Sequence, residues 1–263
     1  MKPKNIPVVI LCGGMGTRMK EETEFRPKPL VEIGGMPIIW HIMKIYSHYG
    51  FNDFILPLGY KGNMIKEYFV NYEWMSNNFT LNLLSRDRNF HYKRKLEDWN
   101  ITFVDTGLDT NTGGRVKRIE HFVRGDEFML TYGDGVADIN IEQLLKFHRT
   151  KNVFATLTGV HPTSSYGVLD VEKNGLIKGF KEKPRLDGII NAGFFVFNRK
   201  VFEYLDKDCI LETEPMERLA SDRQLAVYHH NGFWKSMDTH KDQQLLNKLW
   251  NEKNSPQWKI WED

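Results

Sequence analysis

The sequence predicts an α/β fold, with a Rossmann-like, mixed but mostly parallel sheet flanked by helices. Two observations support this prediction. Through the first half of the chain, apolar runs typical of buried strands alternate with segments of helical period, as in parallel strands joined by helices. In the second half, two alternating runs flank Asn174 and Gly175, which is typical of a β-hairpin and makes the sheet mixed. Because no repeat, low-complexity tract or linker interrupts residues 1–263, we expect a single domain.

The elements of the first half follow from this alternation. The apolar run at 7–12 predicts a buried strand, and 37–50 predicts a helix with a proline in its first turn and a glycine at its end. A strand is expected at 53–60, where Pro57 cannot donate to a ladder and so indicates a bulge or a sheet edge. The other expected elements are a helix at 63–74, strands at 81–85 and 101–107, a helix at 115–123 and a strand at 127–135.

The second half continues with strands at 191–198 and 225–234 and ends with a helix at 240–250. Two tryptophans, Trp258 and Trp261, follow this helix. A free tail would gain nothing from two large apolar side chains. We therefore expect both to pack on the body of the molecule or on a neighbouring subunit.

The charge balance argues against some classes of partner. There are 36 basic and 34 acidic residues, a net charge of +2, which gives no electrostatic basis for binding nucleic acid or an anionic membrane. Residues 85–99 interleave aromatic and basic side chains, but without a basic excess a solvated excursion or an oligomer arm is favoured over RNA stacking. The two cysteines, Cys12 and Cys209, lie in unrelated contexts, and no segment approaches membrane-spanning length. We expect a cytoplasmic protein.

A glycine-rich turn follows the first strand and is the first candidate site. Gly13, Gly14 and Gly16 leave backbone N–H groups open to a phosphate, since no Cβ blocks its approach. A Walker A loop requires Gly-Lys-Ser or Gly-Lys-Thr, which this turn lacks, and a dinucleotide fingerprint requires a third glycine where Met19 stands. A tight structural turn remains as an alternative.

Two cations beside this turn favour phosphate binding. Arg18 can form paired hydrogen bonds with phosphate oxygens, and Lys28 carries a point charge on a stiff frame between Pro27 and Pro29. A glycine turn with both cations predicts a nucleoside triphosphate as the ligand.

Two aspartates are candidate metal ligands. Asp134 lies at the carboxyl end of an apolar strand, where open α/β sheets place ligands, and Asp238 lies in a turn-like segment far along the chain. Magnesium bound among phosphates takes one or two protein carboxylates, so the two side chains could converge on one Mg²⁺ ion. An aspartate before a glycine is also a common turn residue, which remains the alternative for Asp134.

Two further charged stretches are candidates for the acceptor and the nucleotide. Glu182 and Lys183 end the second strand of the hairpin, where an acid and a base could bind the hydroxyls and the phosphate of a phosphosugar; a solvated charge pair is the alternative. A second glycine pair precedes Arg115 and repeats the anion-site pattern, with a helix-initiating turn as its alternative.

The motif Gly-Gly-x-Gly-Thr-Arg, followed by Pro-Lys-Pro, resembles the signature of the sugar-1-phosphate nucleotidylyltransferases. The likeness extends over nearly the whole chain, through "WNITFVDTG", "TGGRVKRI", "LTYGDGVAD", "NAGFFVFN" and "GFWKSMDT", and resembles the members that use CTP and glucose 1-phosphate. The resemblance implies a GT-A-like nucleotidyltransferase fold. It also implies a nucleotide-binding half at about 1–150 and a sugar-binding and oligomerisation half at about 151–263.

The resemblance also implies roles for individual residues. Arg18 and Lys28 would be catalytic, Asp134 and Asp238 would hold Mg²⁺, and Tyr132 would line the junction between nucleotide and sugar. The implied nucleotide-binding residues are Leu11, Cys12, Gly13, Gly14, Met15, Gly16, Thr17, Arg18, Lys28, Thr110, Arg115 and Gly133. The implied sugar-phosphate residues are Glu182, Lys183, Asn191 and Gly193. Cys12 departs from the alanine usual in the family and would place an oxidisable group near the nucleotide.

The activity implied by the resemblance is Mg²⁺-dependent transfer of a cytidylyl group from CTP to glucose 1-phosphate. A homo-oligomer, a hexamer in these relatives, and a place in the synthesis of O-antigen and lipopolysaccharide are implied in the same way. Other bases or sugars, such as UTP, dTTP or a heptose phosphate, remain open, since one sequence does not display the contacts that select a base. A non-catalytic sugar-nucleotide sensor is the alternative from another class, and a dehydrogenase is a third that Met19 weakens.

Overall fold

A seven-stranded sheet forms the centre of the computed structural model, which describes residues 5–91, 96–164, 166–252 and 256–262. The strand order is β14-β10-β13-β8-β1-β4-β7. The strands are β1 Val8–Leu11, β4 Asp53–Leu58, β7 Asn100–Asp105, β8 Glu127–Tyr132, β10 Ala155–Val160, β13 Ile190–Asn198 and β14 Leu225–His229. β13 runs antiparallel to both of its neighbours, and the other pairs in this sheet are parallel. The predicted mixed, mostly parallel α/β fold is confirmed.

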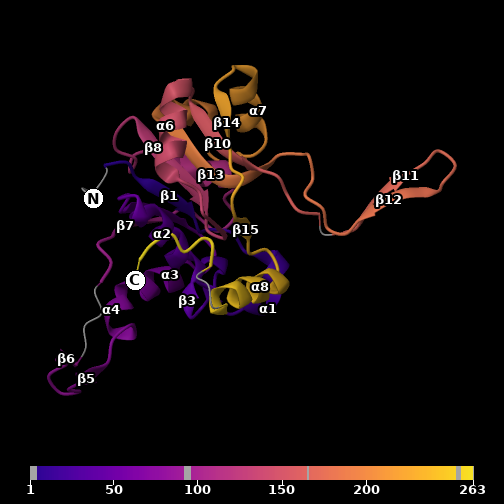
Figure 1. The fold of residues 1–263 in the computed structure, drawn as a ribbon. Helices are drawn as coiled ribbons and strands as arrows, with labels where there is room; N and C mark the ends of the chain where they lie inside the picture. Colours follow the sequence, from indigo (N-terminus) through magenta and orange to yellow (C-terminus); the bar gives the residue numbers. More distant parts are fainter. Residues whose placement is uncertain (1–4, 92–95, 165, 253–255, 263) are drawn as a thin grey trace.

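Helices cover both faces of this sheet (Figure 1). One core contains side chains from α2 Ile38–His48, α3 Gly62–Val70, α6 Ile141–Lys151 and α8 His240–Asn251. The other contains side chains from α5 Thr112–Arg118, η3 Arg199–Tyr204 and α7 Glu214–Ser221. Along β1, Val8 and Ile10 enter the first core and Val9 enters the second, because successive side chains of a strand point to opposite faces.

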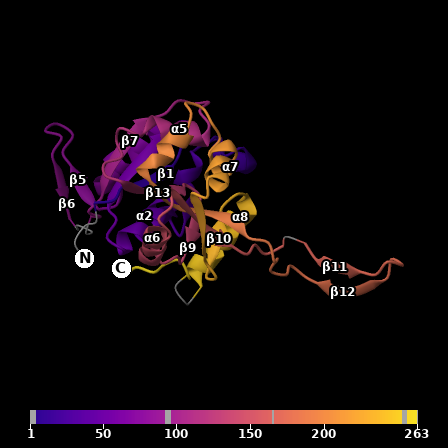
Figure 2. The same ribbon diagram turned by 90° about the horizontal axis from the view of Figure 1, so that it is seen from above.

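Shorter ladders surround the sheet. They pair β2 Glu32–Ile33 with β3 Met36–Pro37, β5 Phe79–Leu81 with β6 Arg88–Phe90, β9 Gly135–Ala137 with β15 Trp234–Ser236, and β11 Val168–Val171 with β12 Ile177–Lys181. The β5–β6 and β11–β12 pairs form two arms that extend away from the body in both views (Figures 1 and 2). The β11–β12 pair is the predicted hairpin around Asn174 and Gly175. The remaining short elements are η1 Thr17–Met19, α1 Lys20–Thr23, η2 Lys28–Leu30 and α4 Tyr72–Met75.

Several expected elements differ from the structure. The helix expected at 63–74 is divided into α3 and α4, and the strand expected at 225–234 is replaced by β14, which ends at His229, and β15, which begins at Trp234. Residues 81–85 do not form a strand: the ladder ends at Leu81, and the Asn82 side chain accepts N–H hydrogen bonds from Leu84 and Ser85 in a turn. The helix expected at 115–123 begins earlier and ends at Arg118. Pro57 lies in an interior strand without a register shift, at the end of β4, where its carbonyl accepts from the Cys12 N–H.

Two other expectations concern residues 85–99 and the two tryptophans after α8. The described part of residues 85–99 is largely exposed and includes β6, as expected for either a solvated excursion or an oligomer arm; residues 92–95 lie outside the described residues. Trp258 and Trp261 are buried on the body, against His41 and Trp40 of α2, so the first of the two alternatives for the tail is confirmed. Within the described ranges, no helix combines the length and apolar character needed to cross a bilayer.

Candidate active site

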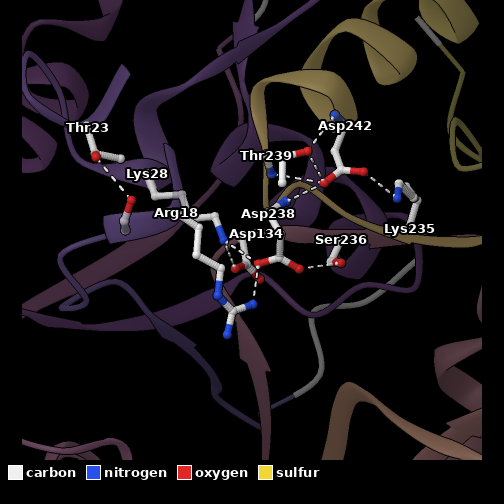
Figure 3. Close-up of polar contacts among 10 residues, drawn as sticks. Arg18, Thr23, Lys28, Asp134, Lys235, Ser236, Asp238, Thr239 and Asp242 are labelled. Atoms are coloured by element: carbon white, nitrogen blue, oxygen red, sulfur yellow. Dashed lines mark hydrogen bonds and ion pairs between the residues drawn. The ribbon is translucent and has the colours of Figure 1, made fainter. Parts of the chain in front are cut away.

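Lys28 lies between the two aspartates that the sequence singled out. Its Nζ donates to Asp134 Oδ2 at 2.5 Å and to Asp238 Oδ1 at 2.9 Å. Arg18 Nη1 lies 3.6 Å from the same Asp238 oxygen. Figure 3 shows these four side chains converging from separate parts of the chain. The structure therefore brings both predicted cations and both predicted metal ligands into one cluster, the Lys28 cluster.

The β9–β15 ladder positions the two aspartates. Asp134 lies between β8 and β9, and Asp238 lies two residues after β15. In the ladder, Ser236 is the partner of Gly135, and the Met237 N–H donates to the Asp134 carbonyl at 2.8 Å. Two carboxylates more than a hundred residues apart in the sequence are thereby fixed side by side.

The start of α8 holds Asp238 in place. Ser236 Oγ donates to Asp238 Oδ2 at 2.8 Å, and the Asp238 N–H donates to Asp242 Oδ2 at 3.1 Å. Asp242 also completes the capping box of α8 with Thr239 and pairs with Lys235 at 2.5 Å. The segment that carries Asp238 is therefore anchored by hydrogen bonds on both sides (Figure 3).

The electrostatics of the Lys28 cluster follow from two carboxylates sharing one ammonium. Burial disfavours the charge of Lys28, but the charges and hydrogen bonds of Asp134 and Asp238 outweigh burial and raise its pKa. Burial raises the pKa of Asp134, with the Asp238 charge adding to it. The pKa of Asp238 is lowered: burial opposes this shift, but hydrogen bonds from Lys28 and Ser236 prevail. The environment thus pushes the pKa values of the two carboxyl groups apart.

The glycine turn leaves its phosphate-binding face open. Gly14, Met15, Thr17 and Arg18 are exposed, and a Cβ on Gly14 would meet no atom within 4 Å. Gly16 has φ +63°, a left-handed conformation that glycine adopts without strain. An open main chain next to an exposed arginine can accept an anionic ligand.

Other residues expected near the nucleotide lie beneath the glycine turn, at the ends of β1 and β8. Leu11 is half-buried at the end of β1, and a Cβ on Gly133 would lie 2.7 Å from the Leu11 carbonyl, so the two strand ends are in close contact. Cys12 is buried, and desolvation raises the pKa of its thiol. Its thiol is therefore largely protonated, which disfavours the thiolate form that reacts most readily.

Arg115 lies beneath the turn rather than on its open face. Its guanidinium is buried and donates to the carbonyls of Leu58, Gly107 and Leu108 and to Thr106 Oγ1, at 2.7–3.1 Å. Thr110 Oγ1 donates to the Thr106 carbonyl at 2.5 Å. These contacts fix the loop that follows β7.

The second glycine pair packs against the chain instead of facing solvent. A Cβ on Gly113 would lie 2.4 Å from Cys209 Sγ, and a Cβ on Gly114 would lie 2.6 Å from the Lys207 carbonyl. The glycines allow the first turn of α5 to approach residues 207–209 closely, which matches the helix-initiating alternative for this pair.

A cavity of about 220 Å³ adjoins the Lys28 cluster. Asp134, Asp238, Asn191 and Tyr132 line it, together with Thr131, Gly135, Ala192, Trp234 and Ser236. Gly193, at φ +79°, packs so closely that a Cβ there would lie 2.2 Å from Tyr132 Cδ2. Of the expected sugar-phosphate residues, the structure places Asn191 in this cavity and Gly193 against its wall.

Glu182 and Lys183 are not brought to this cavity. They follow β12 directly, in the arm that extends from the body, and their side chains pair with each other at 3.6 Å. Both side chains are more than half exposed.

Glu212 contacts the cavity residue Tyr132 and was not predicted from the sequence. It accepts from Tyr132 Oη at 2.5 Å and from Thr112 Oγ1 at 2.7 Å, so it ties the end of β8 to the start of α5. Asn191 Nδ2 contacts the same Tyr132 hydroxyl at 3.4 Å. No local motif marks Glu212, because its partners lie 80 and 100 residues away.

The Lys28 cluster fits a divalent ion that also binds phosphate. Asp134 and Asp238 present adjacent carboxylate oxygens, close enough to share one ammonium. In the described part of the chain, no group of three or more His, Cys, Asp or Glu side chains could hold a metal. Two carboxylates suit a divalent cation that completes its coordination with phosphates and water.

The sequence is similar to those of known proteins over nearly its whole length. The sequence profile of the family described as nucleotidyl transferase matches residues 7–251. The chain is 51% identical over 255 residues to the probable glucose-1-phosphate cytidylyltransferase of Bacillus subtilis (strain 168), covering 96% of this chain and 99% of that one. It is 48% identical over 257 residues to the glucose-1-phosphate cytidylyltransferase of Salmonella typhi, covering 97% and 99%.

Solved structures share the fold. A putative glucose-1-phosphate thymidylyltransferase from Bacillus anthracis superimposes with a TM-score of 0.69 at 18% identity, covering 95% of this chain and 96% of that one. At this identity, the likeness concerns the arrangement of sheet and helices alone.

Proposed function

The chain belongs to the nucleotidyl transferase family, and we propose that it transfers a cytidylyl group from CTP to α-D-glucose 1-phosphate, giving CDP-glucose and pyrophosphate. Relatives named for this activity, 48–51% identical over nearly the whole chain, support the choice of base and sugar. The observation that carries the proposal is the Lys28 cluster. It places two cations and two carboxylates beside an open glycine turn.

The reaction is an in-line attack by a phosphate oxygen of the sugar phosphate on the α-phosphorus of CTP, with pyrophosphate leaving. The attacking phosphate is already anionic at neutral pH, so it needs no general base. The barrier arises from repulsion between two polyanions and from charge that develops on the α-phosphoryl oxygens. The protein therefore acts by neutralisation and alignment.

Each part of the site has a role in this proposal. The glycine turn, from Leu11 to Thr17, and Arg18 hold the triphosphate, and Lys28 contacts it where the acceptor approaches. Asp134 and Asp238 would hold Mg²⁺, which when bound neutralises phosphate charge and polarises phosphoryl oxygens. Arg115, Thr110 and Gly133 shape the floor and the rim of the nucleotide site.

We assign the acceptor, the sugar phosphate, to the cavity lined by Tyr132 and Asn191 and to the β11–β12 arm. Asn191 binds the hexose, and Gly193, which the resemblance also assigns to the sugar, lets the Tyr132 ring pack closely at the cavity wall. The resemblance assigns Glu182 to hexose hydroxyls and Lys183 to the sugar phosphate, although in this structure both lie beside β12 and not at the cavity. We also propose a nucleotide-binding half at about 1–150 and a sugar-binding and oligomerisation half at about 151–263, with Asp238 of the second half contributing to the metal site.

We further propose a cytoplasmic homo-oligomer, a hexamer by resemblance, that contributes to O-antigen and lipopolysaccharide synthesis. Exposed apolar side chains on the β11–β12 arm, including Leu169, Ile177 and Phe180, support an association between copies of this chain.

A pyrophosphate-release assay tests the activity. The purified chain is incubated with glucose 1-phosphate and, in turn, CTP, UTP, dTTP, GTP and ATP, with and without Mg²⁺. Release with CTP that requires Mg²⁺ is the expected result. Preference for UTP or dTTP would correct the base. A parallel series with a heptose 1-phosphate tests the acceptor, and release in that series alone would correct it. If no combination of nucleotide and sugar phosphate released pyrophosphate, the alternative of a non-catalytic sugar-nucleotide sensor would be favoured.

A further inference from the structure

We propose that Lys28 has a second role, as the counter-ion that holds the Asp134 and Asp238 carboxylates together until a nucleotide arrives. A divalent ion then binds these carboxylates firmly only when the triphosphate draws the Lys28 ammonium away. The inference rests on the proposed function, because it takes both aspartates as metal ligands.

The geometry makes the ammonium and a metal ion competitors. Lys28 Nζ contacts one oxygen of each carboxylate, at 2.5 Å and 2.9 Å. A Mg²⁺ ion bound by the same oxygens would lie roughly 2.0–2.1 Å from each of them. The two cations would then be only a few ångströms apart, where like charges repel strongly in a partly buried site. The two cations therefore exclude each other from the shared oxygens.

Lys28 is well placed to exchange partners. Its stem starts beside the glycine turn, since a Cβ on Gly16 would lie 3.3 Å from Lys28 Cβ. Its flexible four-carbon chain lets the ammonium reach different anions from one backbone position. A triphosphate held by the turn thus offers Lys28 new anionic partners close to its present ones.

Without a cation between them, the two carboxylates would repel each other. Their side chains are only 26% and 34% exposed, so water screens this repulsion incompletely. Lys28 contributes one positive charge, and Arg18 contributes a second at 3.6 Å from Asp238. The protein therefore keeps its metal ligands assembled with its own cations.

A thermodynamic consequence follows. If Lys28 competes with the metal and the nucleotide removes Lys28, then nucleotide and metal each strengthen the binding of the other by the same factor. Binding of the metal alone to the free protein should be weak.

The test measures Mn²⁺ binding to the full chain without nucleotide, by electron paramagnetic resonance and calorimetry. Lys28→Met should bind Mn²⁺ at least about tenfold more tightly than the wild type, because the competing charge is gone. Lys28→Gln should act in the same way, and it retains a hydrogen-bond donor in case the methionine variant does not fold. Adding Asp134→Asn to either variant should abolish the gain.

Lys44→Met is the matched control. Lys44 also pairs with a partly buried carboxylate, at 2.9 Å, but that carboxylate belongs to Glu97, which is not part of the Lys28 cluster. This variant should bind Mn²⁺ as the wild type does. If it gained as much affinity as Lys28→Met, a general charge effect would explain the result and the counter-ion role would be refuted.

Two other outcomes separate this inference from the proposed function. If the wild type binds Mn²⁺ alone as tightly as Lys28→Met, the counter-ion role is wrong and the metal ligands stand. If neither protein binds Mn²⁺, even with CTP, the assignment of Asp134 and Asp238 as metal ligands fails and the counter-ion role fails with it.

Discussion

The guanidinium of Arg115 lies directly against Gly13: a Cβ on this glycine would come within 2.2 Å of Arg115 Nη1. The arginine cannot easily yield, because the carbonyls of Leu58, Gly107 and Leu108 and the Thr106 hydroxyl hold it. Arg115 thus sets how deeply the glycine turn sits on the sheet. A buried arginine and a bare main chain together form the support for the open face of the turn.

Gly13→Ala should therefore destabilise the fold. We expect a loss of about 1–3 kcal/mol in the free energy of unfolding, measured in urea, as for other overpacked positions. Gly14→Ala is the control, because a Cβ there meets no atom within 4 Å. It should keep wild-type stability but weaken CTP binding, since the methyl group would stand on the open face. Equal stability of both variants would contradict the role given to Arg115.

Asp134→Asn should remove a metal ligand with little change of volume. Transfer activity is expected to fall roughly a thousandfold or more, with the circular dichroism spectrum unchanged. Asp170→Asn, an exposed position on β11, serves as the control and should remain active. An Asp134→Asn enzyme that turned over within a few-fold of wild type would show that the assignment is wrong.

Glu212→Gln should weaken binding of the sugar phosphate. The carboxylate orients the Tyr132 hydroxyl at 2.5 Å, and Tyr132 lines the cavity with Asn191. We expect the KM for glucose 1-phosphate to rise roughly tenfold, the size of a lost charged hydrogen bond, while the KM for CTP changes little. Tyr132→Phe should give a similar rise, and the double variant should add little to either. Additive effects in the double variant would show that the two side chains act separately.

Stability should fall in acid because of His41. Its Nε2 lies 2.8 Å from the Ile33 carbonyl, and burial lowers its pKa from 6.5 to about 4. The unfolded chain binds this proton more tightly, so stability is full above about pH 6.5 and is lost as the pH falls toward 4. The total loss attributable to His41 is about 3 kcal/mol.

Urea titrations between pH 7 and pH 4.5 check this prediction, with tryptophan fluorescence as the signal because Trp250 and Trp258 surround His41. Over this pH range, the free energy of unfolding of His41→Leu should fall less than that of the wild type. The difference should be most of the roughly 3 kcal/mol attributed to His41. His148→Leu is a useful comparison, since burial also lowers the pKa of His148 and the two contributions overlap. An unchanged pH dependence in His41→Leu would refute the assignment.

Local patterns predicted the parallel part of the sheet well, because buried parallel strands are continuous apolar runs. They failed where an apolar run is exposed: Leu83 and Leu84 are 74% and 96% exposed, and the Asn82 side chain turns the chain there. β10, α6 and α7 were not anticipated, although the Asn140 cap of α6 and Pro215 in the first turn of α7 are helix-start signals.

The site residues, too, were predicted only where the local sequence marks them. The glycine turn and Lys28 carry their own sequence signal, and Asp134 follows a strong strand. The β9–β15 ladder that brings Asp238 beside Asp134 has no local signal, since each strand is three residues long. The same holds for Glu212, whose role depends on long-range contacts.

β10 and β13 pair directly with each other, so the sheet does not depend on the arm between them. From Val160 to Ile190 the chain makes an excursion that begins and ends on neighbouring strands. Hairpins could be lengthened, trimmed or exchanged at this point without disturbing the strand register. With Glu182 and Lys183 on that appendage, selection could remodel acceptor preference while the machinery that activates the nucleotide is inherited unchanged.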